Sequence, residues 1–266
     1  MTDITATPPI VRWAVKIEYD GTGLVGWQRQ NNGISVQELL ENAAARMIGG
    51  QIVPSVTAGR TDAGVHAASI VVHLDFPAGT QFRSHQIRDG LSFHLKPHRV
   101  VVLDAAPVGA EWSARFSALW RRYRFTILNR PSRAALMENH AWHVKRPLNA
   151  ELMQKGADYL LGRHDFSSFR ASACQANSPM RTLDELSVRR EGELIFIETQ
   201  ARSFLHHQVR NMVGSLALVG YGQWEPDKMG EVLAACDRRV AGPTAPSDGL
   251  CFLDVGYEEN PFSKNS

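Results

Sequence analysis

The stretch AGRTDAGVHA, residues 58–67, is the most informative part of this 266-residue chain. Apolar, β-branched runs flank it on both sides, IVPSV at 52–56 and HAASIVVHLDF at 66–76, so we expect a turn between two strands. Asp62 would lie at the tip of that turn, where the backbone holds its carboxylate exposed. This placement suits a nucleophile or a general base, although Asp and Gly are also ordinary capping residues of turns.

Length and composition limit the classes of protein to which the chain can belong. Its 266 residues suffice for one large domain or two of ordinary size, and 44% are hydrophobic, as in globular proteins. No apolar run reaches the roughly 18–20 residues of a membrane span, and MTDITATPPI lacks a signal-peptide pattern. The three cysteines are widely spaced, which argues against a disulfide framework and a zinc site. We therefore expect a cytoplasmic protein without a membrane partner.

Six arginines gather within a short segment, although the net charge of the chain is only +2. They are Arg115, Arg121, Arg122, Arg124, Arg130 and Arg133. Arginine is preferred to lysine where a phosphate is held by two parallel hydrogen bonds. The cluster therefore indicates nucleic-acid binding, and an ordinary solvated basic face is the alternative.

The first half of the chain has the element order of a ferredoxin-like domain. The patterns predict strands at 11–19, 52–57, 66–76 and 100–106, and helices at 36–47 and 84–95. Ser35 is the expected N-cap of the first helix, with Glu38 completing a capping box. The resulting order is strand, helix, strand, strand, helix, strand, which is the split β-α-β arrangement.

The second half repeats this order without detectable sequence identity to the first. It predicts strands at 120–128, 183–190 and 194–201, and helices at 148–161, 206–221 and 227–235. The Pro- and Ser-rich segments at 172–179 and 242–248 indicate ordered loops. We therefore expect an α+β protein with one ferredoxin-like domain at 1–110 and a second at 111–266.

Familiar cofactor and nucleophile motifs are missing from the sequence. It contains no GxxxxGK[ST] loop, no GxGxxG and no G-x-S-x-G elbow. His206 and His207 are adjacent, and His66 and His73 lie seven residues apart, which is poor spacing for ligands of one metal. We expect no cofactor and no metal, and a reaction centred on a carboxylate.

FLHHQVRNMVGSLALVG, residues 204–220, predicts a buried helix, because apolar residues cover most of its sides. Arg210 shares one stripe of this helix with the small residues Gly214 and Ala217. We expect Arg210 to be partly buried, where its charge needs a carboxylate partner. Asp62 is a candidate for that partner, and a structural ion pair with another acidic residue is the alternative.

RRYRF, residues 121–125, alternates like a strand, so Arg121, Tyr123 and Phe125 share one face. Arg122 and Arg124 point to the other face. Tyr123 is therefore either an ordinary core aromatic or a platform on which a base can stack.

Four motifs together resemble the tRNA pseudouridine synthase A (TruA) family. They are GRTDAGVHA at 59–67, WSARFSALWRRYRF at 112–125, HDFSSFR at 164–170 and FLHHQVRNMVG at 204–214. The resemblance runs in the same order from about Val11 to Tyr257, and its first string is long and unusual. Trp112 replaces an expected Phe and Pro131 an expected basic residue, so the departures concern local RNA contacts.

The resemblance implies a reaction and roles for four residues. Members of the family isomerise uridine to pseudouridine at positions 38 to 40 of the tRNA anticodon stem-loop. Asp62 matches the catalytic aspartate, and Arg60 matches the residue that fills the place of the flipped-out base. Tyr123 would stack on the flipped uracil, and Arg210 would pair with Asp62.

Further RNA contacts and a fold are also implied by the resemblance. The implied contacts are Arg83, Trp112, Ser113, Ala114, Arg115, Phe116, Ala173, Cys174, Gln175, Ala176 and Asn177. The implied fold joins two ferredoxin-like halves into one antiparallel sheet with helices on one face and an active-site cleft between the halves. The family acts as a homodimer with tRNA as its partner.

The sequence is also compatible with two other functions. A non-catalytic ferredoxin-like RNA-binding module would explain the arginines and Tyr123, but the usual RNA-recognition signature is missing. A hydrolase would need a second acid, such as Glu111 or Asp165, and would release free uracil.

Overall fold

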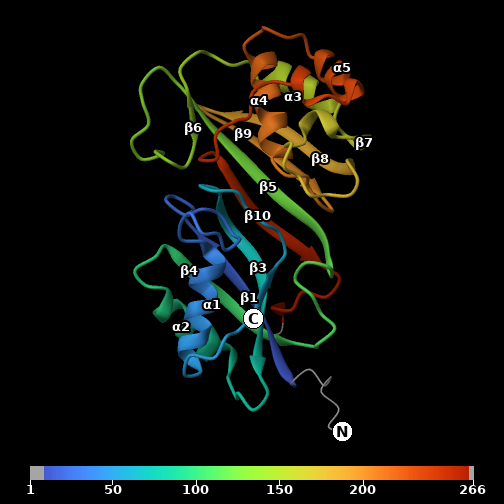
Figure 1. Ribbon diagram of the computed structural model, residues 1–266. Helices are drawn as coiled ribbons and strands as arrows, with labels where there is room; N and C mark the ends of the chain where they lie inside the picture. The colour runs from blue at the N-terminus through green and yellow to red at the C-terminus, as the bar shows by residue number, and fades with distance from the viewer. Residues whose placement is uncertain (1–8, 264–266) are drawn as a thin grey trace. The chain divides into compact units, whose positions relative to one another are not determined.

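The computed structural model describes residues 9–263, which divide into two compact units (Figure 1). The first unit holds the residues up to 63, residues 67–119 and the chain from 255 onward. The second unit holds residues 64–66 and 120–254. Within residues 9–263, no helix is both long and apolar enough to cross a membrane.

The first unit has the element order that the sequence predicts. Its elements are β1 (Ile10–Tyr19), α1 (Val36–Met47), β2 (Ser55–Thr57), β3 (His66–Pro77), α2 (Ser84–Leu95) and β4 (Val100–Val108). β1 lies between β3 and β4 and is antiparallel to both, while the short β2 pairs with β3. α1 and α2 pack side by side on one face of this sheet (Figure 1).

Local sequence explains where the two helices of the first unit begin and how they pack. The Ser35 hydroxyl accepts the Glu38 N–H at 3.2 Å, which caps α1. The predicted bounds 36–47 and 84–95 are confirmed. Gly90 of α2 faces the flexible Met47 side chain of α1, and a Cβ atom at Gly90 would lie 2.7 Å from the terminal methyl group of that side chain. Val36, Leu40, Ile87 and Leu91 are fully buried in this core.

The second unit holds the remaining strands of the ten-stranded sheet, and most of them are antiparallel. Its strands are β5 (Ala118–Asn129), β6 (Trp142–Val144), β7 (Gly162–Asp165), β8 (Met180–Glu191), β9 (Leu194–Ala201) and the first part of β10 (Leu250–Tyr257). β5 pairs with β9, β9 with β8 and β8 with β7, all antiparallel, and β6 runs parallel to β5. α3 (Ala150–Asp158) packs on β8 and against α4 (Gln208–Gly220) and α5 (Lys228–Ala235).

Several predicted bounds in the second unit, and one in the first, are wrong. α3 begins at Ala150, not at 148, because the Asn149 side chain caps the N–H groups of Glu151 and Leu152. α4 begins at Gln208, not at 206, because His207 has a left-handed φ of 61°. The strand expected from 52 begins only at Ser55. The strands β6, β7 and β10 and the short 3₁₀ helices at Ser167–Phe169 and Arg238–Val240 were not predicted.

The predicted α+β class is confirmed, since the sheet is largely antiparallel and helices pack against its strands in each unit. The large buried side chains of the second unit include Phe125, Phe166, Phe169 and Phe252. These phenylalanines come from β5, from the HDFSSFR motif and from β10, so the motifs of the sequence also supply the core.

Candidate active site

Asp62 lies on the turn between β2 and β3, and its neighbour Thr61 fixes the backbone there. The Thr61 hydroxyl and the Tyr19 hydroxyl are 2.7 Å apart, and both residues are buried. The carbonyl of Thr61 accepts the Trp27 N–H at 3.0 Å. Thr61 is thus held by its side chain and by its main chain, immediately before the half-buried Asp62.

Gly26, in the glycine-rich loop 20–34, comes very close to this turn. Gly26 has a φ of +96°, and a Cβ atom there would lie 2.5 Å from the Thr61 oxygen and 2.9 Å from the Asp62 carbonyl carbon. Only a glycine allows this approach of two backbones. The sequence motif that carries Asp62 is therefore supported by a second motif, DGTGLVGW.

Arg60 lies two residues before Asp62 and is exposed. The base of the turn is fixed by the Ala58 N–H, which donates to the Val71 carbonyl at 2.8 Å, and by the Thr57 hydroxyl, which donates to the Gly59 carbonyl at 2.9 Å. The turn therefore presents an exposed guanidinium and a half-buried carboxylate from one fixed backbone.

Arg210 lies in the first turns of α4 in the second unit and is half-buried, as the sequence predicts. Its Nε–H donates to the carbonyl of Ala245 at 2.8 Å, and its own carbonyl accepts the Ala245 N–H at 3.1 Å. The sequence anticipated a carboxylate and missed this backbone partner. Asp62 and Arg210 belong to different units, and their pairing stays a prediction.

Tyr123 lies on the buried face of β5, with Arg121 and Phe125, as the alternation predicts. Its ring meets the ring of Phe204 edge-on at 5.1 Å and that of Phe252 at 5.0 Å. Phe204 begins the FLHHQVRN motif, so Tyr123 adjoins the segment that leads to Arg210. Edge-to-face contacts fix the plane of the Tyr123 ring, which suits either of its two predicted roles.

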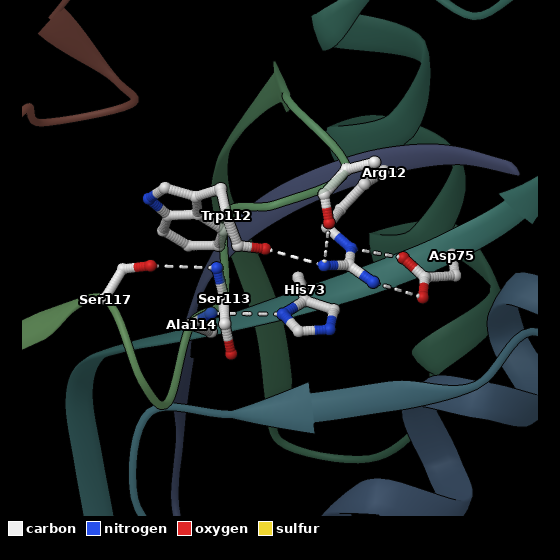
Figure 2. Close-up of polar contacts among 8 residues, drawn as sticks. Arg12, His73, Asp75, Trp112, Ser113, Ala114 and Ser117 are labelled. Carbon is white, nitrogen blue, oxygen red and sulfur yellow. Dashed lines mark hydrogen bonds and ion pairs between the residues drawn. The ribbon is translucent and has the colours of Figure 1, made fainter.

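The segment 112–116 is held by polar side chains of the first unit's sheet (Figure 2). Arg12 of β1 and Asp75 of β3 are cross-strand partners, and two N–H groups of Arg12 bind the two carboxylate oxygens at 2.6 and 2.8 Å. The Nη1 of Arg12 also donates to the carbonyls of Ala110 and Trp112, at 2.6 and 2.7 Å. One guanidinium thus fixes the start of the segment.

Further hydrogen bonds fix the rest of this segment. The Nδ1 of His73 accepts the Ala114 N–H at 3.1 Å, and the Tyr257 hydroxyl donates to the Ala114 carbonyl at 2.8 Å. The Ser113 N–H donates to the Ser117 hydroxyl at 3.0 Å (Figure 2). Ala114 is fully buried, whereas the side chain of Phe116 is 77% exposed. The backbone is therefore rigid, and Arg115 and Phe116 project from it.

The environment of His73 lowers its pKa to about 4, first because the ring is buried and second because the charge of Arg12 is close. The negative charge of Asp75 raises the pKa of His73, but burial and Arg12 together outweigh it. At neutral pH the imidazole is neutral, which leaves Nδ1 available as the acceptor for Ala114.

We expect this shift to make folding stability depend on pH between about 6.5 and 4. Unfolded His73 binds a proton near pH 6.5 and folded His73 only near pH 4, so its contribution is complete above 6.5 and is lost as the pH falls. The loss amounts to at most about 3 kcal/mol. Urea unfolding at pH 7 and pH 4.5 measures it. His73→Asn keeps a hydrogen-bond acceptor but cannot titrate, so the fall in unfolding free energy between the two pH values should shrink by about 3 kcal/mol. An unchanged fall would contradict the lowered pKa of His73.

The segment 173–177 is fastened to the start of the FLHHQVRN motif. Arg170 Nη2 donates to the carbonyls of Cys174 and Ala176, each at 2.7 Å. The Ala171 N–H donates to the His206 carbonyl at 3.0 Å, and the His206 N–H points to the Cys174 sulfur at 3.5 Å. Ala173, Gln175 and Asn177 are exposed, whereas Cys174 and Ala176 are half-buried.

Burial alone would raise the pKa of the Cys174 thiol. The N–H groups of Ala176 and His206 and the charge of Arg170 outweigh this effect, and the pKa is lowered. Cys174 is thus a favourable acceptor for the backbone of the neighbouring motif, which fits its part in holding the loop.

The arginine cluster is less available for phosphate than the sequence suggests. Arg122 pairs with Glu185 at 3.1 Å, Arg124 with Glu198 at 2.8 Å, and Arg130 with Glu193 at 2.8 Å. These three arginines therefore have carboxylate partners within the protein, and a role of the cluster in nucleic-acid binding stays a prediction. Arg83 is exposed just before α2, and its N–H donates to the Gln86 side chain at 2.9 Å.

Sequence reasoning missed the residues that hold the predicted ones in place. These are Tyr19, Gly26, Trp27, Arg12, His73, Asp75 and Ala245. The sequence held a signal for two of them, because His73 and Asp75 are polar residues two apart in the apolar run IVVHLDF, residues 70–76. Nothing in the pattern indicated the contacts of Gly26 or the Ala245 carbonyl.

Comparison with known proteins defines the class to which this chain belongs. Residues 157–258 match a family model described as tRNA pseudouridine synthase. In an alignment of 275 positions that covers the whole of both chains, the sequence is 58% identical to a Gluconobacter oxydans protein named tRNA pseudouridine synthase A. A protein of the same name from Acidiphilium cryptum is 60% identical over 96% of this chain and 99% of its own. Another from Rhodospirillum rubrum is 51% identical over 93% of this chain and 88% of its own. The chain belongs to the tRNA pseudouridine synthase A family.

Proposed function

We propose that this chain isomerises uridine to pseudouridine at positions 38, 39 and/or 40 of the tRNA anticodon stem-loop. The observation that carries the proposal is 58% identity, over the whole of both chains, to a protein named tRNA pseudouridine synthase A. The match includes residues 58–67, and so the turn on which Asp62 lies.

The proposed reaction needs neither an electron carrier nor a donated group. The bond between N1 of uracil and C1′ of the ribose breaks, the uracil turns, and a bond forms between C5 and C1′. The hydrogen on C5 leaves as a proton, and N1 gains one. Asp62 would attack the ribose, add to the uracil ring or remove a ribose proton to give a glycal. All three routes require an ionised carboxylate at a fixed position.

A uridine stacked in a stem is out of reach of Asp62, so we propose that the nucleotide flips out. Arg60 would occupy the vacated place, since its exposed planar guanidinium can stack on bases and bind phosphate. Tyr123 would stack on the flipped uracil. Arg210 would pair with Asp62 through its Nη groups, because its Nε–H is already bound by Ala245.

Two segments with fixed backbones are proposed to contact the tRNA. In residues 112–116 the side chains of Arg115 and Phe116 project outward, and in residues 173–177 those of Gln175 and Asn177 do. Contacts of this kind position an RNA without determining its sequence, which suits an enzyme that accepts neighbouring uridines. Arg83 would add a further phosphate contact. A homodimer and a cytoplasmic location complete the proposal.

Release of tritium from tRNA labelled at C5 of uridine tests the proposal, because the label leaves when C5 bonds to the ribose. We expect release from wild-type tRNA and loss of it when uridines 38, 39 and 40 are all replaced by cytidine. Single replacements identify the position that is modified. Binding without release would favour an RNA-binding module, and free uracil among the products would favour a hydrolase.

A further inference from the structure

The loop at residues 242–246 lies directly on α4, the helix that carries Arg210. The Gly242 N–H donates to the Ser215 hydroxyl at 2.9 Å, and that hydroxyl donates to the Asn211 carbonyl at 2.9 Å. Gly214 has no side chain at the point where the Pro243 carbonyl meets the helix, and a Cβ atom there would collide with that carbonyl. The loop is therefore seated against one stripe of α4, the stripe that includes Arg210 and Gly214.

Ala245 holds Arg210 at two points. Its N–H donates to the Arg210 carbonyl at 3.1 Å, and its carbonyl accepts the Arg210 Nε–H at 2.8 Å. Ala245 itself is only 1% exposed. The main chain and the side chain of Arg210 are thus both held by the same residue of the loop.

This arrangement decides which edge of the guanidinium is used. A guanidinium is planar and donates from five N–H groups in a fixed fork. When Nε–H is bound to a carbonyl, the edge formed by Nε and one Nη cannot bind a carboxylate, and the edge formed by the two Nη groups remains. The position of the Ala245 carbonyl therefore sets the direction in which Arg210 acts.

Thr244 fixes that carbonyl from the neighbouring position in the loop. Its hydroxyl donates to Asn211 Oδ1 at 2.6 Å, and Arg238 Nη2 contacts both the Thr244 hydroxyl and Asn211 Oδ1, at 3.1 and 3.2 Å. Asn211 is 1% exposed, and its Nδ2 donates to the Phe169 carbonyl at 2.8 Å. Thr244 is thereby tied to a buried amide one residue after Arg210, whereas Thr244 itself is exposed.

We propose that Thr244 is a positioning residue for Arg210. Through Asn211 it holds the loop so that the Ala245 carbonyl fixes the guanidinium in the direction required by the reaction. The proposal rests on the proposed function for its kinetic consequences, but its geometric content stands by itself. Thr244 acts on Arg210 through Ala245, the next residue of the loop, and has no part in the chemical step.

Kinetics of Thr244→Val test the proposal, because valine keeps the shape of the side chain and removes the hydroxyl. We expect kcat for tritium release to fall about tenfold with KM for tRNA within about twofold, since a misdirected group costs rate more than binding. Thr244→Ser should restore kcat. Thr80→Val is the matched control, because Thr80 in the other unit also donates one hydroxyl hydrogen bond, to the Pro77 carbonyl at 2.9 Å, and should leave kcat unchanged.

A double-mutant cycle with Arg210→Lys separates positioning from general damage. In the Arg210→Lys protein no guanidinium is left to direct, so adding Thr244→Val should cost less than about twofold in single-turnover kinetics. An equal tenfold loss in both backgrounds would overturn the proposal.

Hydrogen exchange of the Arg210 Nε–H gives a readout that does not depend on activity. The protein is labelled with ¹⁵N-arginine, and the Arg210 Nε–H signal is the one that is absent from the spectrum of Arg210→Lys. This hydrogen should exchange at least about fivefold faster in Thr244→Val than in wild type, because its hydrogen bond is loosened. Unchanged exchange overturns the positioning role, even if the protein modifies tRNA. If exchange is faster in Thr244→Val but the wild-type protein releases no tritium, the positioning geometry is supported and the proposed function is refuted.

Discussion

Replacement of Asp62 by asparagine is expected to abolish tritium release from C5-labelled tRNA, with a loss of at least about 10⁴-fold. Asparagine has the shape of aspartate but is neither a nucleophile nor a base, so all three routes proposed for Asp62 fail together. Thr61, which holds the turn through Tyr19 and Trp27, is unaltered by the change. The affinity for tRNA should stay within about threefold of wild type, because phosphate contacts elsewhere supply most of the binding.

Asp89→Asn is the matched control for this experiment. Asp89 is exposed on α2 and pairs with its neighbour Arg88 at 2.7 Å, so its loss should leave both tritium release and tRNA binding unchanged. Filter binding and single-turnover kinetics on the same tRNA compare the variants. If Asp62→Asn kept more than about 1% of the wild-type rate, the carboxylate could not be essential and another group would carry the chemistry.

The elements of the first unit could be predicted because their signals are local. Ser35 caps α1 from the adjacent residue, and the glycines at 49 and 50 end the helix with φ values of +76° and +97°. The turn that carries Asp62 is bounded by its own flanking strands. In each case the interaction that decides the structure lies within a few residues along the chain.

The parts that could not be predicted depend on partners that are distant along the chain. Arg122 and Arg124 form a basic stripe in sequence, but Glu185 and Glu198 on β8 and β9 neutralise them. Within the second unit, the strand β10 lies beside β5, which comes far earlier in the chain. Arg210 donates to the carbonyl of Ala245. Because every residue has a carbonyl, this partner could not be predicted from the type of residue at position 245.

The contact of Gly26 with the Asp62 turn leads to the second large expected effect. In Gly26→Ala the new Cβ atom would have to lie 2.5 Å from the Thr61 oxygen and 2.9 Å from the Asp62 carbonyl carbon, so the backbone of the turn must move. Displacement of a catalytic group by about 1 Å can cost on the order of 10²-fold in rate. We therefore expect single-turnover tritium release to slow by about that factor, and stability to fall by more than about 1 kcal/mol.

Gly23→Ala separates the strain of the loop from the displacement of Asp62. Gly23 lies in the same loop with a φ of +78°, but a Cβ atom there would have no atom of residues 9–263 within 4 Å, so alanine adds backbone strain without a collision. It should lose about 1 kcal/mol of stability and keep the wild-type rate. Equal rate losses in the two variants would show that general loosening of the loop is responsible. A loss confined to Gly26→Ala would mean that the glycine-rich loop sets the position of Asp62, because only that variant pushes on Thr61 and Asp62 themselves.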